Sequence, residues 1–349
     1  MKTHTHMRRC IGRAALAATA FGLSLAAQAQ TSGTKIEAMV AAALPAAVGD
    51  EAAIVKLLSA TGAEKPFSSV VTMTTLASVL GDSFASEPNC APAGSDKSET
   101  ETLADQVAER CVYEGKGSYL RYEINDGKFS YLNPTRAYFG TANTLAQADA
   151  QKKIINVAAK IGIPSVEIRS ARIKTLDRML MSSKDGKDKK IIRAEVTTRI
   201  PRQVGEVPVL GSRMSATIDA KGRIATMYAS WPDFVMTPTA KEAPVVSRDA
   251  MTKAVSRLIA VTHGDGGKLA KVTATVVYAD LGQLTNSAEQ GSEADDGTGD
   301  EQPQQPSRYV PAILVRVSAV EPPEDGKTIG LPLLEFVQPL VNLSAPENG

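Results

Sequence analysis

Few residues of this 349-residue chain have the types and spacing that catalysis or metal binding requires. His263 lies in the glycine-rich stretch THGDGG. A zinc peptidase uses two or three His, Cys or carboxylate ligands at defined spacing, and one histidine does not supply them. A Ser-His-Asp triad would need the same histidine, but no G-x-S-x-G motif precedes it. We therefore expect no catalytic residue, no metal site and no cofactor.

Two charged clusters also invite a chemical interpretation. One contains Asp295, Asp296, Asp300 and Glu301, and its spacing does not match a calcium-binding D-x-D-x-D-G loop. The other gathers four lysines between residues 184 and 190, where interspersed aspartates weaken the case for phosphate binding. Both patterns favour solvated surface segments over ligand sites.

Cys90 and Cys111 are the two cysteines that follow the N-terminal segment. In an oxidising compartment, an isolated pair in a polar region predicts one disulfide. Closing a loop of about 20 residues would contribute roughly 3 kcal/mol to stability. Two free thiols are the alternative. A bonded pair leaves no thiol nucleophile.

The first 29 residues have the parts of a secretory signal peptide. Three arginines precede an apolar run over residues 14–27, and the AQA that ends at Ala29 fits the A-x-A cleavage rule. The run is shorter than the about 20 residues of a membrane span. We expect cleavage after Ala29, a periplasmic or secreted protein, and no transmembrane segment. A retained N-terminal anchor is the alternative.

The charge of the mature chain argues against two classes of partner. Cleavage would remove four of the 39 basic residues and none of the 38 acidic ones, which leaves a formal net charge of −3. This balance does not indicate nucleic acid or an anionic membrane as a partner. The low aromatic content is consistent with a bacterial exported protein. About 320 mature residues predict two or three domains.

Residues 30–111 are predicted to be a mostly helical region that ends in a disulfide-tied loop. Apolar residues recur at helical spacing after Ile36. Asp50 is a suitable N-cap for a second helix, and Gly62 follows the end of that helix. Residues 68–80 fit either a strand or a helix.

The next segments change to β patterns. In residues 112–142, Asn125-Asp126-Gly127 separates two alternating runs and predicts a β-hairpin. Residues 143–240 predict one helix followed by about four antiparallel strands. The strict alternation over residues 192–200 is typical of a sheet with one solvated face.

Residues 244–345 repeat this order. Ser247 is a suitable N-cap, Asp249 lies in the first helical turn, and three strand-like runs follow. Between two of these runs, residues 286–307 carry almost no apolar side chains and are expected to be a disordered insertion. We interpret the two units as a structural duplication within an α+β protein.

The stretch GEVPVLGSRMSATIDAKGRIATMYASWP resembles the secreted PepSY and FTP-type domains. These cystatin-like modules occur in propeptides of thermolysin-family metallopeptidases and in free-standing exported proteins. The matching positions are Gly205, Val207, Pro208, Val209, Gly211, Arg213, Ile218, Asp219, Gly222, Arg223, Ile224, Trp231 and Pro232. In the second unit, the corresponding aromatic-x-Pro-Ala strand start is Tyr309, Val310, Pro311 and Ala312.

The resemblance covers roughly residues 112–340. It implies modules of one helix packed on a curled antiparallel sheet, without catalytic residues. It also implies a role in holding or restraining a peptidase or another exported protein. No peptidase domain follows within residues 1–349, so the target would be a separate protein.

Two features of the resembling stretch bear on binding. The candidate partner-binding edge comprises Val207, Pro208, Val209, Gly211 and Arg213. An edge strand can accept a partner's strand, and proline is tolerated there because it donates no ladder hydrogen bond. Blocking aggregation is the alternative role of the proline. Trp231 is expected to pack in the core and not to contact a partner.

The sequence therefore predicts an exported, non-catalytic protein- or peptide-binding protein with two PepSY-like modules. Its expected partner is a secreted peptidase, restrained or assisted in trans, or another exported protein. One alternative is a hydrolase whose site lies outside the modules. Another is an envelope-associated structural protein that docks through residues 31–80. The sequence indicates no oligomeric state.

Overall fold

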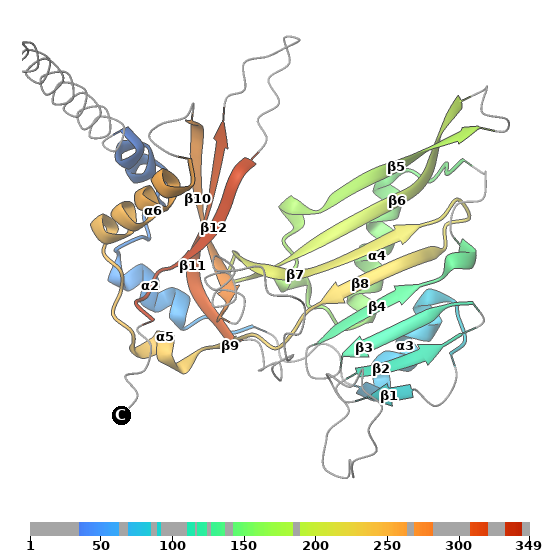
Figure 1. The fold of residues 1–349 in the computed structure, drawn as a ribbon. Helices are drawn as coiled ribbons and strands as arrows, with labels where there is room; N and C mark the ends of the chain where they lie inside the picture. The colour runs from blue at the N-terminus through green and yellow to red at the C-terminus, as the bar shows by residue number, and fades with distance from the viewer. Residues whose placement is uncertain are drawn as a thin grey trace, which may run out of the picture. The chain divides into compact units, whose positions relative to one another are not determined.

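The computed structural model describes residues 35–62, 69–84, 89–91, 110–115, 117–123, 127–136, 142–183, 189–263, 269–281, 308–319 and 332–343. Over these residues the protein is α+β, with a large, mostly antiparallel sheet and few helices (Figure 1). No helix in the described part is long and apolar enough to cross a membrane.

The chain divides into two compact units, each assembled from separate parts of the sequence. Unit 1 comprises Met1–Lys56, Glu242–Val276 and Pro311–Gly349. Unit 2 comprises Leu57–Lys241 and Val277–Val310. The predicted signal peptide (1–29), the predicted insertion (286–307) and the acidic cluster lie outside the described residues, as does most of the lysine-rich turn.

The sheet of unit 2 has the strand order β1-β2-β3-β4-β8-β7-β6-β5, and all of these neighbours pair antiparallel. The predicted hairpin of residues 112–142 is confirmed as β3 and β4, with Glu123 opposite Lys128. The strands are β1 (Asn89–Ala91), β2 (Arg110–Glu114), β3 (Tyr119–Glu123), β4 (Lys128–Leu132), β5 (Lys174–Ser183), β6 (Lys189–Val204), β7 (Val207–Ile218) and β8 (Ile224–Ser230).

Helices cover one face of this sheet. They are α3 (Ser69–Leu80) and α4 (Gln147–Lys160), and Figure 1 shows both behind the strands. Ile154 of α4 and Leu76 of α3 are fully buried in the same core cluster as Met214 of β7. Gly162 ends α4 with a φ of 89°, a left-handed conformation that glycine adopts without steric cost. The sequence thus predicted α4 and the four strands after it correctly.

Two polar networks tie separate elements of unit 2 together inside the core. Arg202 of β6 is fully buried and donates to Glu167 Oε2 (2.8 Å) and to the carbonyl oxygen of Pro232 (2.5 Å). Arg136 donates to the carbonyls of Leu80 and Gly81 at the end of α3. The two arginines thereby provide donors to backbone carbonyls at the end of α3 and at Pro232.

Unit 1 contains a helix over residues 35–43, most of α2 (Glu51–Leu58) and α6 (Arg248–His263). It also holds β12 (Pro332–Pro339) and most of β10 (Leu269–Asp280) and β11 (Arg308–Ala319), in the order β10-β11-β12. The predicted N-caps are confirmed, because Asp50 Oδ1 accepts from Ala53 N and Ser247 Oγ from Ala250 N, each at 3.2 Å.

One side chain joins two helices of unit 1 that lie far apart in the sequence. The Arg248 guanidinium, in the first turn of α6, donates to the carbonyls of Ala41 (3.0 Å), Leu44 (2.9 Å) and Pro45 (2.9 Å). The Ala41 carbonyl lies in the last turn of the helix over residues 35–43, and those of Leu44 and Pro45 follow it directly. A cation is favoured there because the helix dipole places partial negative charge at a C-terminus.

Short elements complete the described chain. They are α5 (Pro238–Glu242) and β9 (Val235–Met236), of which β9 pairs parallel with the start of β11. In unit 2, Thr237 N donates to the carbonyl of Tyr309. This hydrogen bond and the pairing with β9 hold Tyr309 within unit 2.

Candidate functional site

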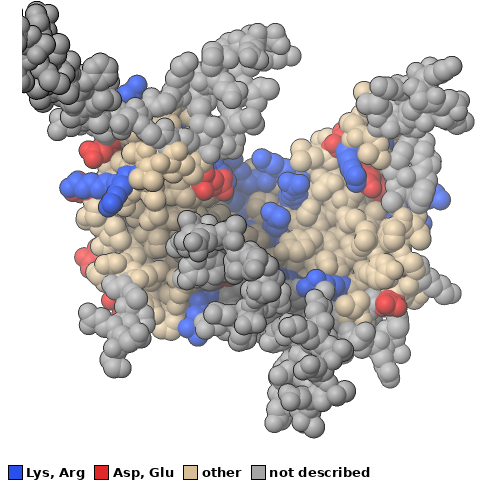
Figure 2. Space-filling model, in the orientation of Figure 1, with Lys and Arg blue, Asp and Glu red and all other residues tan. Residues whose placement is uncertain are grey.

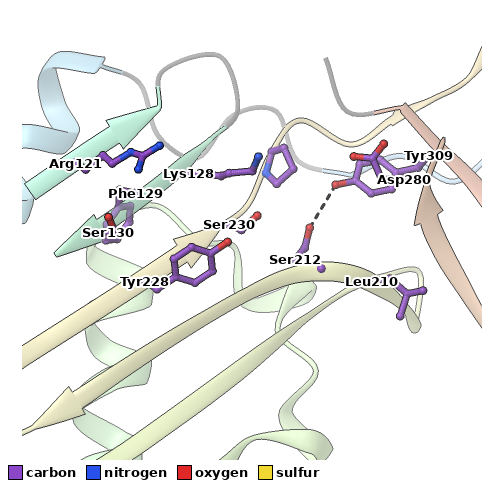
Figure 3. A pocket seen from close by; sticks show the side chains of 12 residues that line it. Arg121, Lys128, Phe129, Ser130, Leu210, Ser212, Tyr228, Ser230, Asp280 and Tyr309 are labelled. Carbon is purple, nitrogen blue, oxygen red and sulfur yellow. Dashed lines mark hydrogen bonds between the residues drawn. The ribbon is translucent and has the colours of Figure 1, made fainter. Parts of the chain in front are cut away.

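A pocket of about 370 Å³ opens on the face of the unit 2 sheet that the helices leave uncovered (Figure 3). Its volume is in the range of small-molecule and side-chain binding pockets, about 300 to 1,000 Å³. β3, β4, β7 and β8 supply most of the wall, and the ends of β10 and β11 supply the rest. The polar lining residues are Arg121, Lys128, Ser130, Ser212, Tyr228, Ser230, Asp280 and Tyr309.

A large bulge in β7 makes one wall. Gln203 of β6 pairs with Pro208 of β7, and the next pair is Pro201 with Arg213. Two steps along β6 thus correspond to five steps along β7, which leaves three extra residues in β7. The extra residues separate from β6, and Leu210, Gly211 and Ser212 line the pocket. Gly211 has a φ of 75°, a conformation that glycine adopts at no steric cost. The bulge therefore directs Ser212 into the pocket.

An aromatic cluster supports the opposite wall. The Tyr309 hydroxyl lies 3.3 Å from Ser212 Oγ, a hydrogen bond that Figure 3 shows. The ring of Phe234 stacks on Tyr309 at 5.0 Å and meets Tyr278 edge-on at 4.8 Å. Burial raises the pKa of Tyr278 to about 12, so this phenol stays neutral at physiological pH. The aromatic part of this wall is consequently packed and uncharged, and Asp280 lies beside it.

The two sides of the pocket differ in charge. Figure 3 shows Arg121 and Lys128 on one side and Asp280, next to Tyr309, on the other. Tyr228 lies below the cationic side, and Arg213 sits over its ring at 6.0 Å. Arginine, lysine and hydroxyl donors together bind anionic oxygens, and a carboxylate accepts from N–H groups. The pocket is suited to a polar ligand that carries negative charge at one end.

The candidate edge residues are all found in β7, but they do not form a free edge. Val207 pairs with Val204 and Pro208 with Gln203, across the two-residue turn at Gly205 and Glu206. On the other side of β7, Tyr278 bridges to Val209, and β8 pairs from Arg213 onward. These residues therefore do not form a free edge, because neighbouring strands already pair with most of them. Their role in partner binding stays a prediction. Gly211 instead lines the pocket, and Arg213 lies on the uncovered face.

The residues of the other two predicted sites are not among those that line the pocket. Trp231 is fully buried and donates its indole N–H to Glu167 Oε2 at 2.8 Å. Cys90 in β1 lies opposite Cys111 in β2 in the backbone register. Directly opposed residues in an antiparallel pair have Cα atoms about 4.5 to 5.5 Å apart, within the range of disulfides. The disulfide itself stays a prediction.

Two pocket cations, Arg121 and Lys128, were not predicted from the sequence. They occupy alternate strand positions whose neighbours face the core, so the period-two pattern marks them as outward-facing. Every solvated strand face shows this alternation, so the pattern does not distinguish a binding face from any other exposed face. The pairing of β4 with β8, which brings the cations close to Tyr228, is not encoded in any local pattern.

His263 ends α6, and among the described residues no group of three or more His, Cys, Asp or Glu could hold a metal ion.

No family model matches the chain, and no curated protein matches it. An uncharacterized protein from Eubacterium rectale has a solved structure that is similar at a TM-score of 0.41, with 10% sequence identity. That similarity covers 78% of this chain and 79% of the other.

Proposed function

We propose that the chain is an exported, non-catalytic binding protein, and that it holds a peptide or protein segment on the uncovered face of the unit 2 sheet. The observation that carries this proposal is that the two faces of the unit 2 sheet differ in what covers them. α3 and α4 bury one face, whereas a polar pocket opens on the other. A solvated sheet face with fixed cations and hydroxyls is suited to recognition of a polar chain segment.

The pocket walls favour recognition because their groups are already held in place. Ser212 is buried and hydrogen-bonded to Tyr309, and the Tyr309 ring is stacked on Phe234. A site whose donors are fixed before binding loses less conformational entropy when a ligand arrives. Peptide segments present both carbonyl acceptors and N–H donors, which match the hydroxyl and carboxylate groups of the lining.

The proposal includes the PepSY-like modules. The order of α4 followed by β5–β8 supports a first module over residues 143–240, and α6 followed by β10–β12 supports a second over 244–345. In this proposal the partner is a secreted peptidase restrained or assisted in trans, or another exported protein. The signal peptide would direct export and be removed by cleavage after Ala29.

Site-specific crosslinking tests the proposal. A photoreactive phenylalanine analogue replaces Tyr228 on the uncovered face in one variant and the exposed Ala159 on α4 in the control. The variants are expressed in the native host, and adducts are recovered from periplasm and medium. We expect a single exported protein bound at position 228, an adduct that the purified partner reproduces with purified protein.

Identical adducts at both positions would show contact without a site on this face. No reproducible adduct at position 228 would exclude the proposed binding face. A peptidase as the partner would lead directly to an activity assay, in which the purified chain should change the rate of peptide cleavage.

A further inference from the structure

We infer that the ligand of the uncovered face is an acidic peptide segment of an exported partner, bound in extended form across the strands. This inference rests on the proposed function and specifies its ligand. The recognising surface, here called the basic band, consists of five side chains that lie on five of the six neighbouring strands β3, β4, β8, β7, β6 and β5 of unit 2. They are Arg121, Lys128, Lys174, Arg199 and Arg213.

The strand register places these cations in two adjacent rows. One row crosses the sheet from β3 to β5 through directly opposed residues: Arg121, Ser130, Tyr228, Ser215, Arg199 and Lys174. The next row contains Lys128, Ser230 and Arg213. Residues two apart on a strand face the same side, so both rows lie on the uncovered face.

The side chains of the band reach solvent or the pocket. Lys174, Arg199 and Arg213 are exposed, and Arg121 and Lys128 line the pocket while partly buried. Tyr228, in the middle of the row, is 37% exposed and carries the Arg213 guanidinium over its ring. The band is therefore a continuous surface that leads out of the pocket.

Charge is unbalanced along the first row. None of its six residues is acidic, whereas Lys128 in the second row has Glu123 as its register partner. The described carboxylates farther along β5 and β6 are already paired, Glu195 with Arg178 (3.0 Å) and Asp177 with Arg193 (2.6 Å). In Figure 2, Lys and Arg side chains gather toward the middle of the view, at one end of the unit 2 sheet, and the rest of the visible sheet is mostly uncharged. This potential attracts an acidic ligand and repels a basic one.

The length of the band sets the size of the ligand. β3 and β5 are separated by five strand intervals, which at about 4.8 Å each gives roughly 24 Å. An extended peptide rises about 3.3 Å per residue, so about seven residues span the band. Alternate side chains of such a peptide project to one side, and glutamates at every second position would face the cations. The serine and tyrosine hydroxyls between the cations can bind the peptide backbone.

Fluorescence anisotropy with defined peptides tests the inference. The probe is a labelled, N-acetylated and C-amidated octapeptide of alternating Glu and Ala, and its matched control replaces each Glu by Gln. We expect the acidic peptide to bind residues 30–349 at least about tenfold more tightly than the neutral one. Added salt should weaken binding, because exposed charges are screened.

Matched charge variants locate the site. The double variant Arg199→Gln/Arg213→Gln should weaken binding of the acidic probe about tenfold or more. The control Lys152→Gln/Lys160→Gln removes two charges from exposed positions on α4, behind the sheet, and should change affinity less than about twofold. Circular dichroism and thermal unfolding establish that both proteins stay folded.

Several outcomes would overturn the inference while leaving the proposed function intact. Equal binding of the acidic and neutral peptides would remove the charge preference. Equal losses in both double variants would assign the effect to net charge. Tighter binding of an eight-nucleotide thymidine oligomer would assign the band to nucleic acid. Binding of the probe only after deletion of residues 286–307 would make the chain's own acidic segment the occupant. Failure of the proposed function itself would be seen separately, as loss of the specific adduct at position 228.

Discussion

Trp231 donates its indole N–H to Glu167 Oε2 at 2.8 Å, across 64 residues of sequence. The same carboxylate oxygen accepts from Arg202 Nε at 2.8 Å, and the Arg202 guanidinium lies 5.5 Å from the centre of the Trp231 ring. One carboxylate thus holds both the tryptophan and a fully buried arginine at the end of the sheet. The tryptophan is part of a charged network and not only of the apolar core.

Replacing Glu167 should destabilise unit 2 strongly. Glu167→Gln keeps an acceptor for the indole but leaves the Arg202 charge buried without a counterion, at a cost of about 3–5 kcal/mol. The control Glu335→Gln removes the partner of Arg316 in a half-exposed pair and should cost less than about 1 kcal/mol. Denaturant unfolding measures both. Similar losses in the two variants would show that the Glu167 charge is not needed for stability.

Two substitutions of Trp231 separate its volume from its hydrogen bond. Trp231→Ala should cost about 3–5 kcal/mol because the side chain is fully buried. Trp231→Phe keeps most of the ring but removes the N–H, and it should cost less than the alanine variant. A thermal midpoint within a few degrees of wild type for Trp231→Ala would contradict a core role.

The stability of unit 2 should depend on the ionisation of Asp82. Burial alone raises the pKa of this carboxyl, but hydrogen bonds from Tyr131 and Asn133 and the charge of Arg136 outweigh it, and the pKa falls below its ordinary value of 3.8. Because the folded-state pKa is depressed, the contribution is fully present above about pH 4 and is lost as the pH falls through the folded-state pKa.

The variant Asp82→Asn tests this dependence. At pH 7 it should be less stable than wild type by about 2 kcal/mol, the usual magnitude for hydrogen bonds to a charged group. The difference should shrink as the pH is lowered from 4 towards 2, because wild type then loses the same charge. Urea unfolding at several pH values measures it. A constant difference would show that Asp82 does not ionise in this range.

Gly127 and Gly222 should respond differently to alanine. Both have positive φ, 55° and 75°, so each substitution costs about 1–2 kcal/mol of backbone strain. A Cβ at Gly127 would also lie 2.7 Å from the carbonyl oxygen of Trp231, whereas one at Gly222 meets nothing within 4 Å. We expect Gly127→Ala to be the more damaging in thermal unfolding. Equal effects would contradict the close approach at Gly127.

The predicted disulfide can be measured directly. Protein purified from an oxidising compartment should show no free thiol under denaturing conditions, and reduction should increase its mass by two hydrogens. Cys111→Ser should then cost about 3 kcal/mol of stability, close to the estimate for a loop of this length. Two reactive thiols in the unreduced, denatured protein would show that Cys90 and Cys111 are not bonded.

The features that sequence predicted well are those that local chemistry determines. Asp50 and Ser247 cap their helices, and β3 and β4 pair as a hairpin around Gly127, as expected. Each depends on the backbone preference or hydrogen bonding of a residue within its own turn. These local preferences are present in any sequence window that contains the turn.

Such local preferences do not determine which strands pair or which residues far apart in the sequence come into contact. Pro208 suggested an edge because proline donates no ladder hydrogen bond, yet it lies next to a bulge, where a missing donor is equally tolerated. Arg202 appeared as one of many alternating strand residues, and its burial depends on Glu167 being brought to it by the fold. The band likewise exists only through the register of several strands.

Arg248 has a consequence for the order in which the protein forms. Its acceptors, Ala41 and Leu44, are made more than 200 residues before it, so the first helix cannot acquire this partner until most of the chain has been synthesised. Unit 1 as a whole is complete only when its last segment, Pro311–Gly349, has also been synthesised. The first helix of the chain is thus made early but reaches its final contacts among the last elements to form.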